Sequence, residues 1–171
     1  YRVVLEDRVE RLKKRKIRFI DDALYHQDDA REVVDSIVAQ LNADMIGRNG
    51  GPNATFDTRV SGAAMVNKLY VVGPNAAPNN QSRALGAILD SVNAHQARPM
   101  QLDHEWDSTT HPEKIYERSD HYNYAKKGIP IIFFTTGLHE GYHKVSDEPQ
   151  KIDYAKMARI GKLLVQMAET V

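Results

Sequence analysis

Residues 129–135 read Ile-Pro-Ile-Ile-Phe-Phe-Thr, and this apolar run of β-branched and aromatic side chains decides the fold. Such a run predicts a central strand that is buried on both faces. Residues 68–73 predict a second buried strand, residues 41–47 a strand that ends in a glycine turn, and residues 100–105 a further short strand. A sheet is therefore expected at the centre of the molecule.

Helical patterns alternate with these strands. Apolar spacing predicts helices over residues 81–95, 119–127 and 153–170, and an amphipathic helix followed by a short strand over residues 3–16 and 16–20. This alternation predicts an α/β domain with a mixed, largely parallel sheet covered by helices on both faces. Ligand-binding groups are then expected at the carboxyl ends of the strands.

Composition limits the partners and the chemistry. The 171 residues suit a single domain, 1–171, and Lys plus Arg balance Asp plus Glu at 23 each, so the overall charge gives no reason to expect nucleic acid or an anionic membrane as partner. The sequence contains no apolar run of the roughly 20 residues that a membrane span needs. Without cysteine, any metal must be held by carboxylates and by the seven histidines.

Two side chains at predicted strand ends are candidate ligands. Asp44 lies in the otherwise apolar strand 41–47, where a buried carboxylate would need a cation or several hydrogen-bond donors. Capping of a neighbouring helix explains Asp44 equally well. His143 lies in the loop after the strongest strand, and a solvated loop histidine is its simplest alternative interpretation.

The same loop carries a misleading motif. Residues 139–143 read His-Glu-Gly-Tyr-His and match the H-E-x-x-H zinc pattern, which requires a helix to bring both histidines to one face. Here the segment follows a strand and contains Gly141 at its centre, so a helical zinc site is not expected.

Three segments in order resemble the co-catalytic two-zinc aminopeptidases, relatives of bacterial leucyl aminopeptidases and glutaminyl cyclases. They are IVAQLNADMIGRN (residues 37–49), LYVVGPN (residues 69–75) and RSDHYNYAKKGIPIIFFTTGLHEGYHKVSDEPQKID (residues 118–153). The resemblance covers residues 37–171 as the C-terminal part of an incomplete phosphorylase/hydrolase-like zinc exopeptidase domain and leaves residues 1–36 outside. It implies peptide substrates and an extracellular or periplasmic location.

The resemblance also implies a site. Asp44 would bind one zinc and His143 the other, in a centre that holds two zinc ions when complete. Asp147 would orient a ligand or a substrate amine, Asp120 and His121 would approach from a helix start, and Tyr142 would line the substrate pocket. For Asp120, stabilisation of a helix N-terminus is an equal alternative, and for Tyr142, simple loop packing is.

The family's Glu-Glu pair, which supplies the general base and a ligand, has no counterpart in this sequence. Asp21-Asp22 and His26-Gln27-Asp28 lie upstream but lack the family's glycine-rich surroundings. The missing groups could lie in an upstream segment or an oligomer partner, the chain could be a degenerate relative, or Asp21 and Asp22 could replace them in part. The catalytic base is therefore unassigned. The two functions left open are an aminopeptidase and a non-catalytic peptide-binding or structural module on the same fold.

Overall fold

The computed structural model describes residues 39–49, 65–76, 80–139 and 141–171. A four-stranded sheet in the order β1-β4-β2-β3 forms its centre. The strands are β1 (Gln40–Ala43), β2 (Lys68–Val72), β3 (Gln101–Asp103) and β4 (Ile131–Thr135). β1 runs parallel to β4 and β3 parallel to β2, whereas β2 is antiparallel to β4. The predicted mixed sheet is therefore confirmed, with two parallel pairs joined antiparallel at its middle.

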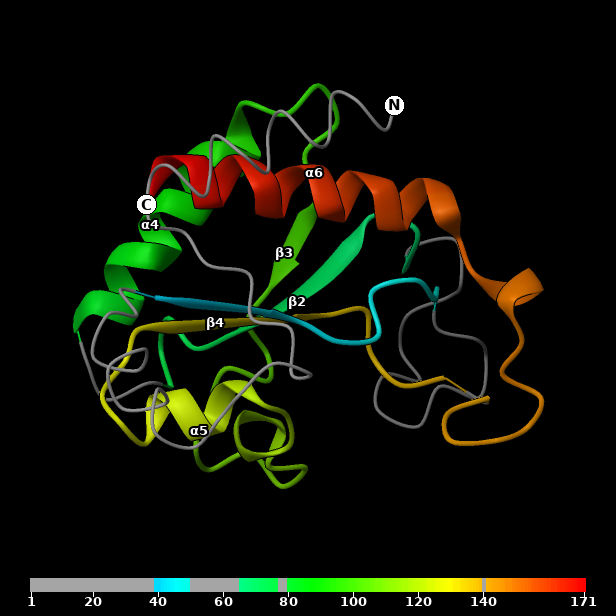
Figure 1. The fold of residues 1–171 in the computed structure, drawn as a ribbon, viewed down its shortest axis with the longest axis horizontal. Coiled ribbons are helices and arrows are strands. Elements are labelled where there is room, and N and C mark those ends of the chain that lie inside the picture. Colours follow the sequence, from blue (N-terminus) through cyan, green and yellow to red (C-terminus); the bar gives the residue numbers. More distant parts are fainter. Residues whose placement is uncertain (1–38, 50–64, 77–79, 140) are drawn as a thin grey trace, which may run out of the picture.

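Helices cover both faces of this sheet (Figure 1). One face carries α4 (Asn80–Ala94) and α6 (Tyr154–Thr170), and the opposite face carries the short helix α5 (His121–Ala125). Two single 3₁₀ turns, η2 (Ile115–Glu117) and η3 (Pro149–Lys151), precede α5 and α6. The expected α/β class is confirmed. Among the described residues, no helix has the length and apolar character needed to cross a bilayer. The expected helix at 3–16 and strand at 16–20 lie outside the described part.

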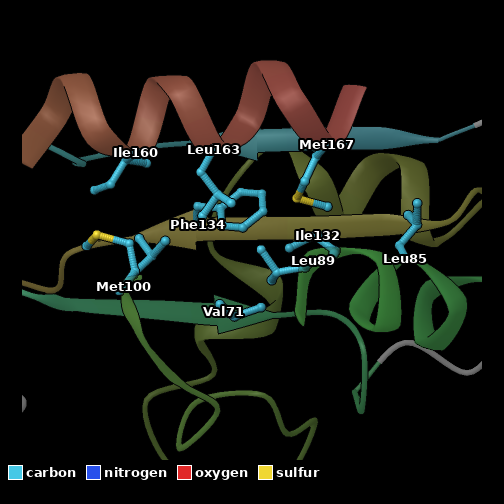
Figure 2. Close-up of a cluster of buried hydrophobic side chains, with 10 residues drawn as sticks. Val71, Leu85, Leu89, Met100, Ile132, Phe134, Ile160, Leu163 and Met167 are labelled. Atoms are coloured by element: carbon cyan, nitrogen blue, oxygen red, sulfur yellow. The ribbon is translucent and has the colours of Figure 1, made fainter. Parts of the chain in front are cut away.

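Alternation along the central strands builds two cores. In β4, Ile132 and Phe134 face α4 and α6, while Ile131 and Phe133 face the α5 side. Figure 2 shows the first core, in which side chains of α6 pack onto β4 and those of α4 fill the space beside β2. Its labelled members are Val71, Leu85, Leu89, Met100, Ile132, Phe134, Ile160, Leu163 and Met167. Burial on both faces explains why the sequence of β4 is continuously apolar.

The start of α6 is fixed by a cap that also ties it to the chain after β1. The side chain of Asp153 accepts the backbone N–H of Lys156 at 2.9 Å, which satisfies a free donor of the first helical turn. The other oxygen of Asp153 accepts from the amide of Asn49 at 2.7 Å, and its backbone N–H donates to the carbonyl of Gly47 at 2.8 Å. The turn after β1 is therefore held against α6.

Lys156 adds a buried cation to this junction. Its ammonium donates to the carbonyls of Met65 at 2.5 Å and Arg48 at 3.4 Å, and the side chain is 1% exposed. Burial lowers the pKa of Lys156 to about 8, although the carboxylate of Asp153 acts in the opposite direction. The folded protein thus loses this proton at a lower pH than the unfolded chain does.

We expect this difference to make the fold more stable in base. Between pH 8 and the unfolded lysine value of 10.5 the unfolded chain binds more protons, so the free energy of unfolding should rise with pH, by about 1–3 kcal/mol. Urea unfolding of the wild type from pH 7 to 10.5 measures the slope, and Lys156→Met should lack it. Parallel curves for the two proteins would contradict the expectation.

Candidate functional site

A pocket opens at the sheet edge where the parallel strands β1 and β4 both end. Figure 1 shows the course of these two strands. Its walls combine polar groups at the strand ends with apolar side chains from the α5 side. The lining residues are Asp44, Met45, Trp106, Ile115, Arg118, Ser119, Phe133, Thr135, Gly137, Leu138 and Tyr142. Two of the six site residues predicted from sequence, Asp44 and Tyr142, are among them.

Asp44 lies one residue beyond β1 and is exposed, which corrects the expectation that it lies within a buried strand. Its N–H still donates to the carbonyl of Phe134 at 3.1 Å, so the backbone follows β4 to this point. Met45 then turns the chain with a positive φ of 57°, and its carbonyl accepts both the N–H and the hydroxyl of Thr136. The carboxylate is therefore presented to solvent on a fixed turn, without the cost of burial.

A hydrogen-bond relay orients this carboxylate. The amide of Asn42 donates to the hydroxyl of Ser119 at 2.9 Å, and that hydroxyl donates to Asp44 Oδ2 at 3.1 Å. Asn42 and Asp44 are two residues apart and so lie on the same face of an extended segment, which gives the Asn-x-Asp motif a physical reason. A partner for Asp44 was expected from sequence because the carboxylate was expected to be buried; it is exposed, and its contact with Ser119 was not predicted.

His143 lies on the loop that follows β4, and its exposed ring stacks on Tyr142 with centroids 3.9 Å apart. Its backbone has a positive φ of 56°, and residues 141–146 around it form turns and a bend. His139 is buried whereas His143 is exposed, so the two do not share a helical face. The structure thus agrees with the rejection of a helical H-E-x-x-H site; Glu140 lies outside the described part.

Asp147 contacts two protein side chains, and its expected role in orienting a ligand or a substrate amine stays a prediction. Its Oδ1 accepts from the guanidinium of Arg48 at 2.6 Å, and its Oδ2 lies 3.6 Å from Nε2 of His139. Both carboxylate oxygens therefore face protein groups. Arg48 was not among the residues predicted from sequence, because nothing local pairs position 48 with position 147.

The Ser119-Asp120-His121 segment divides between pocket and core. Ser119 lines the pocket, and Asp120 is exposed at the N-terminus of α5 without a side-chain capping bond. His121 is fully buried, stacks on Phe133 with centroids 4.5 Å apart, and donates from Nε2 to the carbonyl of Tyr116 at 2.7 Å. Burial lowers the pKa of His121 to about 4, against the opposing effect of the Tyr116 carbonyl, so its imidazole is neutral at physiological pH. It supports the pocket wall from behind.

The apolar wall was not predicted from the sequence, where residues 106–112 look polar and irregular. Trp106 is buried and stacks on Tyr70 with ring centroids 3.9 Å apart and planes at 8°. Gly137, at φ +93°, lets the chain pass over these rings, because a β-carbon there would lie 3.2 Å from Tyr70 and 3.4 Å from Trp106. The sequence signal that could have indicated this wall is Trp106, the single tryptophan of the chain, within a polar stretch.

The described residues alone do not make a complete zinc site. Asp44 and His143 offer the right donors, a carboxylate oxygen and an imidazole nitrogen, but a catalytic zinc takes three protein ligands. Within the described residues, no group of three or more His, Asp or Glu side chains could hold a metal ion. Asp21, Asp22, His26 and Asp28, considered from sequence as substitutes, lie outside that part.

Together, the α/β sheet and the polar groups at its strand ends define a hydrolase-like domain whose donors suit a metal ion. A family model, Peptidase family M28, matches residues 22–168, and the chain belongs to this family of zinc metallopeptidases. The match begins upstream of residue 37, where the first of the three resembling segments starts. Searches of curated proteins and of solved structures found no match.

Proposed function

We propose that this chain is the peptide-binding and metal-binding part of a zinc aminopeptidase that removes N-terminal residues from peptides. The observation that carries the proposal is the pocket in which the Asn42–Ser119 relay aims the carboxylate of Asp44 beside an apolar wall. Asp44 and His143 would each supply one zinc ligand. The remaining donors would come from residues outside the described part or from a partner subunit.

The residues around Asp44 suit the two halves of such a reaction. Zinc, when bound, supplies a Lewis acid and an activated water. Tyr142 and Trp106 would hold the side chain of the N-terminal residue, and exposed Asp120 would attract its free ammonium group. As with the family's exported members, we place the protein outside the cytoplasm.

A panel of dipeptides tests the proposal and its specificity. The pocket wall is apolar and is built from Trp106, Ile115, Phe133 and Leu138. Zinc-reconstituted protein should therefore cleave Leu-Gly or Phe-Gly at least about tenfold faster than Glu-Gly. A tenfold ratio of rates corresponds to a difference of roughly 1.4 kcal/mol in how well the pocket binds the two side chains. N-acetyl-Leu-Gly should not be cleaved. Cleavage of the acetylated peptide at an equal rate would reject an aminopeptidase.

A second function is favoured by one specific observation. The chain has no Glu-Glu pair to supply the family's general base, and the described residues gather no three metal ligands. A non-catalytic peptide-binding module would show saturable binding of Leu-Gly by calorimetry, with no hydrolysis at any zinc concentration. Turnover that disappears in Asp44→Ala would eliminate it.

A further inference from the structure

One ion pair joins the two chain segments that carry the candidate ligands. Arg48 lies four residues after Asp44, and Asp147 four residues after His143, yet their side chains meet at 2.6 Å. The Arg48 side chain is only 13% exposed and that of Asp147 38% exposed, so the pair is partly shielded from water. Such a charge-assisted bond is stronger than a fully exposed pair.

The Arg48 end of this pair stands on a fixed base. Its backbone N–H donates to the Thr136 hydroxyl at 3.3 Å, and its carbonyl accepts from the buried ammonium of Lys156 at 3.4 Å. Thr136 directly follows β4 and Lys156 lies in the first turn of α6, and both side chains are buried. The guanidinium therefore projects from a backbone that is held on both sides.

The Asp147 end belongs to a loop held together by its own turns. Backbone bonds run from Tyr142 to His139, from Lys144 to Gly141 and from Asp147 to Lys144. Asp147 also packs on Gly141, where a β-carbon would lie 3.4 Å from its own, and faces His139. A displacement of Asp147 would therefore be passed to the turn that carries Tyr142 and His143.

We propose that Arg48 is a positioning residue: through Asp147 it fixes the His143 loop relative to the turn that carries Asp44. The catalytic meaning of this coupling rests on the proposed function, but the coupling itself is a property of the metal-free chain. It also gives Asp147 a role in placing the ligand-bearing loop, with its charge directed to Arg48.

Hydrogen–deuterium exchange of zinc-free protein tests the proposal. Arg48→Met keeps most of the buried stem and removes the charge, so peptides covering residues 141–147 should exchange about tenfold faster, as expected for the loss of one charge-assisted bond. Arg48→Lys keeps a cation and should restore most of the protection. Arg83→Met, on the exposed face of α4, is the matched control and should change nothing in this loop.

Exchange in β4 separates a local effect from general loosening. If Arg48→Met speeds exchange in residues 131–135 as much as in 141–147, or if Arg48→Lys exchanges like Arg48→Met, the positioning role is wrong. Asp147→Asn provides a second variant should Arg48→Met fold poorly, and it should also accelerate exchange in the loop alone. The exchange experiment uses neither zinc nor substrate. Its result therefore tests the positioning role of Arg48 even if the proposed peptidase function is wrong.

Discussion

Replacing Asp44 by alanine is expected to lower the zinc affinity of this chain by roughly 100-fold or more and to remove peptidase activity with it. The carboxylate is exposed at the pocket, on a turn fixed by Thr136, and the substitution removes a donor that no neighbouring described side chain replaces. Zinc affinity is measured by competition with a chromogenic chelator. His143→Ala should produce a loss of the same order, whereas Asp90→Ala, an exposed carboxylate on α4, should produce none.

The relay behind Asp44 predicts a graded series. Ser119→Ala removes the hydroxyl that donates to the carboxylate, and a tenfold loss of zinc affinity is expected, at the lower end of about 10–100-fold for partners of metal ligands. Asn42→Ala should lower the zinc affinity less, because Asn42 acts through Ser119.

Equal zinc affinities in the wild type and Asp44→Ala would reject Asp44 as a ligand. A loss in Ser119→Ala as large as that in Asp44→Ala would show that Ser119 binds the metal or the substrate directly.

Within the part of the chain that the structure describes, local patterns predicted the helices and strands well, since each depends on neighbouring residues. The apolar run at 129–135 became β4, buried along its whole length, and the spacing from residue 153 became α6 with Asp153 as its cap. For β1 the pattern was less informative: the strand ends at Ala43, and after one further backbone bond from Asp44 to Phe134 the chain turns away from β4 at Met45, which has a positive φ. Such a turn has no signal in hydrophobic periodicity.

The arrangement of these elements could not be derived in the same way. Nothing in the sequence of β2 specifies that it runs antiparallel to β4, because both strands are equally apolar and buried on two faces. The contacts that shape the site are also non-local: Ser119 meets Asp44 across 75 residues and Arg48 meets Asp147 across 99. Candidate ligands could be named from their motifs, whereas their supporting partners required the structure.

The structural role of Asp107 was not predicted from the sequence. It lies in the polar stretch after β3, yet its side chain is fully buried and accepts three backbone N–H groups at the end of β2. Oδ1 accepts from Gly73 at 2.7 Å and from Ala76 at 2.8 Å, while Oδ2 accepts from Asn75 at 2.8 Å. This one carboxylate therefore holds the loop that leads from β2 towards α4.

Of the substitutions proposed for this protein, removal of the Asp107 carboxylate should lower the free energy of unfolding most. Asp107→Ala would leave three donors without their acceptor, and we expect it to lower the free energy of unfolding by about 3–4 kcal/mol. Asp107→Asn keeps one oxygen for Gly73 and Ala76 but turns an amide N–H₂ towards Asn75, so about 2 kcal/mol is expected. Urea unfolding at pH 7 measures both, with Asp90→Asn as the matched surface control.

Acid adds an independent check on the same group. Burial alone would raise the pKa of Asp107, but hydrogen bonds from His104 and the three backbone N–H groups outweigh it and hold the pKa below its usual value. The carboxylate therefore stabilises the fold above the unfolded value of about 4, and this contribution should disappear as the pH falls below it. Asp107→Asn should lack that part of the acid loss, so the difference in the free energy of unfolding between the wild type and Asp107→Asn should shrink as the pH falls below the unfolded value. Trp106 is the chain neighbour of Asp107 and forms part of the pocket wall. If the difference in the free energy of unfolding between the two proteins stayed constant from pH 7 to pH 3, the loss in Asp107→Asn would come from altered packing of this wall and not from the lost charge.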